Sequence, residues 1–114
     1  MKNLFSLLLF TFLFVSCSSD STEDLTTPTP TSVTYTASVK AIVDQSCATT
    51  GCHNSTANSG GLTLENYTQV KNAFQNRNAL GRMESTSNPM PASGNLPSTS
   101  IEIIKKWRDQ GYVD

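Results

Sequence analysis

The stretch Cys47-Ala48-Thr49-Thr50-Gly51-Cys52-His53 constrains this chain more than any other part of its sequence. It places two thiols and an imidazole in the order C-x4-C-H. The familiar haem-attachment signature is C-x-x-C-H, with a shorter loop between the cysteines. In such a site the two thiols bond to the two vinyl groups on one edge of a porphyrin, and the adjacent imidazole binds the iron. The stretch therefore predicts covalently bound haem c, with Cys47 and Cys52 as the thioether residues and His53 as an axial ligand.

The N-terminus has the pattern of a bacterial export signal. Lys2 supplies a positive charge, and residues 4–15 form an apolar run interrupted only by a serine and a threonine. The run is too short to cross a bilayer, which needs about 20 residues, but it suits a signal peptide. The sequence at its end, Phe-Val-Ser-Cys, resembles a lipobox. We therefore expect residues 1–16 to be removed and Cys17 to be lipidated, with ordinary cleavage and a free Cys17 as the alternative.

Export also limits the possible partners. Loss of residues 1–16 removes one charge, that of Lys2, so the formal net charge at pH 7 changes from −1 to −2. A chain with this balance has no basic patch for a nucleic acid or an anionic surface. We expect membrane contact through the lipid alone, with the protein facing the periplasm or the cell surface. Disulfides form in such compartments, where Cys47 and Cys52 are the remaining cysteine pair.

Residues 17–32 are predicted to be a flexible tether, and residues 33–114 a single folded domain. The tether is rich in Ser, Thr, Pro and acidic residues, and Leu25 is its only large apolar residue. It can bury too little surface to offset the entropy of ordering. A domain of about 80 residues buries only about 60% of its unfolded surface. Domains of this size usually need a staple or a bound group, and a covalent haem supplies both.

The helical pattern of the domain predicts an all-α fold, with three main helices around the haem. In the first helix, residues of one helical face recur at the expected spacing, and Thr34 or Thr36 is placed to cap its start. That face consists of Val39, Ile42, Val43, Ser46 and Cys47. Because Cys47 extends the face, its thiol is expected to point into the core.

Two further helices are expected downstream, separated by a loop that contains three prolines and a glycine. The second helix is predicted over residues 64–75, and a short further turn over residues 79–83. The last helix is predicted to begin at Thr99, because Thr99 and Glu102 have the spacing of a capping box. Gly111 suits the C′ position, where helices end.

An iron that only carries electrons needs a second axial ligand, and His53 is the only histidine in the chain. Met90 lies in Asn88-Pro89-Met90-Pro91, where the prolines restrict the backbone to extended shapes. Such a loop can direct a thioether inward, so Met90 is the predicted second ligand and Met83 the alternative. Methionine and histidine ligation together raise the reduction potential. The competing interpretation of Met90 is a methionine that fills a gap in the core.

These motifs together resemble class I c-type cytochrome domains, in particular the planctomycete-type cytochrome c domains of small lipoproteins. The resemblance covers about residues 35–113 and includes the stretches 47–53, 60–67, 89–91 and 103–111. It implies haem held by thioethers at Cys47 and Cys52, His53 as the proximal ligand and Met90 as the distal ligand. It also implies that the last helix packs across the first. The longer loop between the cysteines departs from the family pattern.

The resemblance implies a monomeric, membrane-anchored cytochrome that passes single electrons between redox partner proteins. It implies no enzymatic activity, because both axial positions of the iron are filled. An accessory role beside a larger oxidoreductase uses the same motif. A haem-free alternative is a helical interaction module, stapled by a Cys47–Cys52 disulfide or holding zinc through Cys47, Cys52 and His53. The zinc interpretation lacks the fourth ligand that structural zinc sites almost always have.

Other residues have two interpretations each. Arg82 is either a partner for a haem propionate or a solvated surface residue. Trp107 and Tyr67 either line the haem pocket or belong to the core, where aromatic residues at helical spacing more often lie. Tyr35 and Phe74 are predicted to be core residues.

Overall fold

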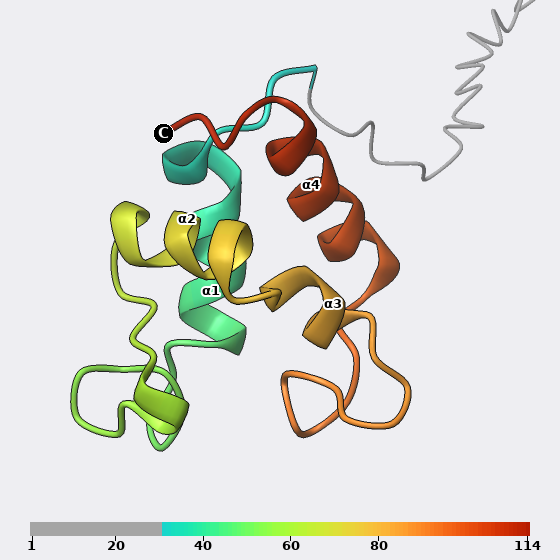
Figure 1. The fold of residues 1–114 in the computed structure, drawn as a ribbon. Coiled ribbons are helices and arrows are strands. Elements are labelled where there is room, and N and C mark those ends of the chain that lie inside the picture. The colour runs from blue at the N-terminus through green and yellow to red at the C-terminus, as the bar shows by residue number, and fades with distance from the viewer. Residues whose placement is uncertain (1–30) are drawn as a thin grey trace, which may run out of the picture.

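The computed structural model describes residues 31–114. The predicted signal peptide, the lipidation site Cys17 and most of the predicted tether lie outside the described residues. Residues 31–114 contain four α-helices, two short helical turns and no strand (Figure 1), which confirms the all-α class. In chain order these are a π-helical turn (Tyr35–Val39), α1 (Lys40–Ser46), a 3-10 turn (Ser59–Gly61), α2 (Tyr67–Asn76), α3 (Ala79–Met83) and α4 (Ser98–Asp109).

The first helix begins at the predicted cap, but its first turn is π-helical. The Thr34 hydroxyl accepts a hydrogen bond from the Ala37 amide at 3.2 Å, so Thr34 rather than Thr36 caps the helix. The Lys40 amide donates to the Tyr35 carbonyl, five residues earlier, which is the hydrogen-bond pattern of a π-helix. From Lys40 onward the chain continues as α1.

α2 begins three residues later than the apolar pattern predicts. The Asn66 side chain caps it by accepting a hydrogen bond from the Gln69 amide at 3.0 Å. Leu64 precedes the helix, and its amide donates to the His53 carbonyl at 2.8 Å. The predicted start at residue 64 is therefore wrong, because a tertiary hydrogen bond and a side-chain cap prevail there. α3 spans Ala79–Met83, as predicted.

The capping box predicted at Thr99 and Glu102 is wrong. α4 begins at Ser98, and Pro97 occupies the N-cap position without a side-chain hydrogen bond. A proline suits a helix start because it has no N–H and so leaves no unsatisfied donor there. The Glu102 carboxylate lies 3.6 Å from the ammonium of Lys105 within the helix.

The end of α4 follows the prediction at Gly111. This glycine has a φ of +85°, a conformation that side chains with a Cβ rarely adopt. Its amide donates to the Arg108 carbonyl at 2.9 Å, and the Tyr112 amide donates to the Trp107 carbonyl at 2.9 Å. Together these two bonds form a Schellman motif. The turn brings the Tyr112 ring back against Trp107, with ring centroids 4.9 Å apart.

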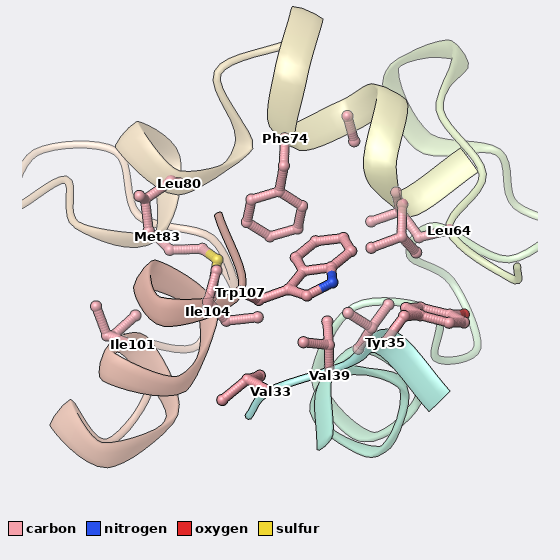
Figure 2. Packing of buried hydrophobic residues seen from close by; sticks show 13 residues of the cluster. Val33, Tyr35, Val39, Leu64, Phe74, Leu80, Met83, Ile101, Ile104 and Trp107 are labelled. Atoms are coloured by element: carbon pink, nitrogen blue, oxygen red, sulfur yellow. The ribbon is translucent and has the colours of Figure 1, made fainter. Parts of the chain in front are cut away.

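Trp107 lies at the centre of the hydrophobic core (Figure 2). Its side chain is fully buried, and its ring meets the Phe74 ring edge-on at a centroid distance of 5.7 Å. The indole N–H donates to the Val113 carbonyl at 2.7 Å, so its only polar group is satisfied. Tyr35 is also buried and lies 6.2 Å from Trp107 between ring centroids. The core predictions for Tyr35 and Phe74 are confirmed, and Trp107 is likewise a core residue.

The start of the described chain lies beside its C-terminus (Figure 1). The Gln110 side chain accepts from the Val33 amide at 2.8 Å and donates to the Thr31 carbonyl at 3.1 Å. The Tyr35 amide donates to the Val113 carbonyl at 2.8 Å. α4 also packs against the π-helical turn at the start of the first helix. No helix within residues 31–114 has the length and apolar character needed to cross a membrane.

Candidate functional site

Two loops extend from the end of the molecule that lies away from the C-terminus (Figure 1). The first follows α1 and contains residues 47–66, and the second joins α3 to α4 across residues 84–97. A cavity of about 570 Å³ is lined by residues of both loops, and its size falls in the usual range of cofactor sites. It is lined by residues 45–47, 49, 51–53, 59 and 90–96.

A second cavity, of about 250 Å³, shares four lining residues with the larger one: Cys47, His53, Ser59 and Met90. Its other walls are mostly apolar, with two arginines among them. These walls are formed by Gly60, Leu62, Leu64, Phe74, Arg77, Ala79, Arg82 and Met83. His53 and Met90 therefore line both cavities, and the smaller cavity adds apolar side chains and two arginines.

His53 is held in one orientation by hydrogen bonds. Its amide donates to the Cys47 carbonyl at 3.0 Å, and its ring Nδ1 lies 3.1 Å from the Leu62 carbonyl oxygen. A carbonyl can only accept, so this bond requires a proton on Nδ1, and in the neutral ring Nε2 then keeps a free lone pair. Metal-binding histidines are usually oriented in this way, by donating from the other ring nitrogen to a carbonyl or carboxylate.

The Leu62 carbonyl was not among the predicted site residues. The signal for it was Gly60-Gly61, at the start of the stretch 60–67 that the resemblance includes. Both glycines have positive φ, +65° and +68°, and this conformation reverses the chain after the cysteine loop. The reversal returns Leu62 to His53.

The two cysteines differ in their surroundings. Cys47 follows the last residue of α1, is partly buried, and lines both cavities. Burial, with a smaller contribution from nearby Cys52, raises the pKa of the Cys47 thiol from 9.0 to about 11. Cys52 is exposed and lines the larger cavity. Both are free cysteines, so the larger cavity contains two free thiols and the imidazole that follows them.

This difference predicts unequal alkylation of the two thiols in the chain without haem. Only a thiolate is nucleophilic, so at about pH 8 iodoacetamide should modify Cys52 and leave Cys47 largely unmodified. With a pKa of about 11, roughly one Cys47 thiol in a thousand is ionised at that pH. Peptide mapping by mass spectrometry measures this, and unfolding in urea should make both thiols react. Equal labelling in the folded chain would show that Cys47 is not buried.

The same pKa shift makes the stability of the haem-free chain depend on pH. The folded state raises the Cys47 pKa above its ordinary value, so folding favours the neutral thiol. The stabilising contribution is present below about pH 9 and is lost as the pH rises toward about 11.

The two candidate methionines occupy different positions. Met90 lies in the second loop, its side chain is 36% exposed, and it lines both cavities. Met83 is at the end of α3, is only 4% exposed, and lines the smaller cavity alone. Met90 therefore borders the same space as Cys52 and the imidazole, whereas Met83 is mainly a member of the core.

The remaining candidates are placed as follows. The Arg82 Nε donates to the Asn88 carbonyl at 3.2 Å. Arg82 also lines the smaller cavity, as does Arg77, which the sequence interpretation did not single out. Tyr67 borders neither cavity, and its hydroxyl donates to the Tyr112 carbonyl at 2.7 Å.

Within the part of the chain that the structure describes, no three His, Cys, Asp or Glu side chains gather as a group that could hold a metal ion. This arrangement gives no support to zinc bound by Cys47, Cys52 and His53. A haem iron needs fewer ligands from the protein than a zinc ion does, because the porphyrin supplies four of them. Comparisons of the chain with protein-family models, with curated proteins and with solved structures gave no match.

Proposed function

We propose that this protein is an exported, lipid-anchored c-type cytochrome that carries single electrons through one haem c. In this proposal Cys47 and Cys52 hold the haem by thioethers, and His53 and Met90 bind its iron. The observation that carries the proposal is the 3.1 Å contact between His53 Nδ1 and the Leu62 carbonyl. It directs the proton to Nδ1 and leaves Nε2 as a ligand, in a residue that directly follows a cysteine and lines both cavities.

The chemistry of the donor set fits a haem. The first loop contributes two cysteines and a histidine to the lining of the larger cavity, and the second loop contributes a methionine. The adjoining cavity adds apolar walls and two guanidinium groups. A porphyrin needs these features together, because its ring is apolar while its two propionates are anionic. The two cavities together are much larger than the space that a Cys47–Cys52 disulfide would occupy.

The haem would supply the reversible one-electron chemistry, while the chain would set its ligation and surroundings. His53 keeps its orientation through the Leu62 carbonyl. Met90 would complete the ligand set with a thioether, which would favour the reduced iron and raise the potential. With His53 and Met90 both bound to the iron, no position would remain open for a substrate, and we infer a carrier rather than an enzyme.

The cellular setting of the proposal depends on the N-terminal sequence. A lipid on Cys17 would attach the protein to a bacterial membrane, and residues 17–32 would let the domain reach its redox partner proteins. An exported compartment is also where haem is attached to c-type proteins. A stable stoichiometric complex with an enzyme, recovered by pull-down, would favour the accessory role over that of a free carrier.

Pyridine-haemochrome spectroscopy tests the proposal directly. The full chain is expressed together with a c-type maturation system, purified from membranes, and denatured before measurement. We expect about one covalently attached haem per chain. A colourless product ends the cytochrome proposal. If that product also gains the mass of two hydrogens on reduction, the chain is instead a module stapled by a disulfide between Cys47 and Cys52, which both line the larger cavity.

A further inference from the structure

Arg82 binds the loop that carries Met90 through both its main chain and its side chain. Its carbonyl accepts a hydrogen bond from the Met90 amide at 3.0 Å. Its Nε donates to the Asn88 carbonyl at 3.2 Å. One residue at the end of α3 thus holds the segment Asn88–Met90 at two points.

The first of these hydrogen bonds is the only one that a backbone N–H of the segment Pro89-Met90-Pro91 can donate. Both prolines lack an N–H, so Met90 supplies the single amide hydrogen of the three residues. No helix or strand supports them either. The Arg82 side chain adds a second bond next to the first, which reduces the conformational freedom of the Met90 backbone.

A second anchor holds the other arm of the loop. The Asn95 side-chain amide donates to the Met83 carbonyl at 2.9 Å and to the Ser85 carbonyl at 3.3 Å. Both arms therefore return to the end of α3. Between them the Met90 side chain remains 36% exposed at the border of the two cavities, so packing alone does not determine its position.

We propose that Arg82 is a positioning residue for Met90, acting through the Nε–H bond to the Asn88 carbonyl rather than through its charge. The proposal rests on the proposed function, in which Met90 is an iron ligand. A ligand on an exposed loop competes with solvent and with external ligands. Holding the loop near its bound conformation lowers the entropy cost of ligation and so favours Met90 over its competitors.

Two substitutions separate the donor from the charge. Arg82→Gln removes the charge but places an N–H₂ at the position of Nε, so it can still donate to the Asn88 carbonyl. Arg82→Leu removes both the donor and the charge without adding a thioether to the cavity. Both residues are tolerated in a helix such as α3. Arg77→Leu is the matched control, because it removes a guanidinium from the same cavity but from another element.

The first measurement is amide hydrogen exchange at Met90 in the mature chain expressed without maturation proteins. Arg82→Leu should speed this exchange about fivefold, the factor expected for one ordinary hydrogen bond. Arg82→Gln and Arg77→Leu should leave it near the wild-type rate. Exchange in the core, at Val70 and Ile104, reports whether each variant is folded. This measurement does not depend on haem, so it tests the anchor even if the proposed function fails.

The second measurement uses the protein matured with haem and titrates it with imidazole, which competes with Met90 for the iron. Arg82→Leu should bind imidazole about fivefold more tightly, while Arg82→Gln should bind it as the wild type does. Equal effects of the two variants would assign the role to the charge and overturn the proposal, as would no effect of either. The chain could also fail to bind haem after maturation and still show the exchange difference. The loop anchor would then exist, but the proposed function and the ligand role of Met90 would both be overturned.

Discussion

Replacing both Cys47 and Cys52 with serine is expected to abolish covalent haem entirely. A serine hydroxyl does not add to a vinyl group under the conditions in which a thiol does, so no thioether can form. A haem stain of the denatured chain should fall from full intensity to background. The contrast is the largest expected for any change in this protein, because it removes every proposed bond between the chain and the porphyrin.

The control for this experiment is Ser46→Ala, which changes the neighbouring residue and the wall of the same cavity but removes no thiol. It should keep full haem staining. The single cysteine variants show whether both thioethers form across the longer loop. Each single variant should retain covalent haem with one unreacted vinyl group, which shifts the pyridine-haemochrome band. A double variant that keeps covalent haem would show that Cys47 and Cys52 are not the attachment residues.

Met90→Ala is expected to change the iron centre strongly, because Met90 is the one proposed iron ligand on the second loop. Loss of the thioether should abolish the weak near-infrared sulfur-to-iron absorption band. It should also lower the reduction potential by on the order of 0.2 V, a fraction of the roughly 0.8 V range that axial ligands span. The stability of the chain without haem should change little, because the side chain is partly exposed and leaves no large cavity in the core.

Met83→Ala is the matched comparison, because it removes the other thioether near the smaller cavity. Met83 is 4% exposed and packs in the core. Its loss should therefore cost about 2–5 kcal/mol of unfolding free energy, while the near-infrared band and the potential stay nearly unchanged. Spectroscopy and denaturant unfolding should therefore give opposite patterns: Met90→Ala changes the iron centre and Met83→Ala changes the stability. If the patterns are exchanged, Met83 is the ligand.

Local signals in the sequence predicted several features that the structure contains. Thr34 caps the first helix, α3 forms over the expected residues, and Gly111 ends α4. Each depends on atoms within a few residues of one another, such as a hydroxyl near an exposed amide or a residue that tolerates positive φ. Such interactions form whatever the rest of the chain does, so a sequence pattern is sufficient to predict them.

The predicted starts of α2 and α4 were wrong because other groups competed with the local pattern for the start of each helix. Leu64 fits a helical face, but its amide bonds to the His53 carbonyl, and the helix begins only after Asn66. Thr99 and Glu102 fit a capping box, but α4 begins one residue earlier, at Ser98, with Pro97 at the N-cap position. In both places a competing partner nearby or across the fold changed which residue became the cap. A periodic pattern carries no information about that competition.

The sequence by itself determined the helical class and the chemical groups of the candidate site: two thiols, one imidazole and two methionine thioethers. Only the tertiary structure decided how those groups are placed. It bonds the His53 ring to the Leu62 carbonyl, places Met90 at both cavities, and ties the loop of Met90 to Arg82. The physical reason is that the two loops lie far apart along the chain, and only the packing of the helices around Trp107 brings their ends together.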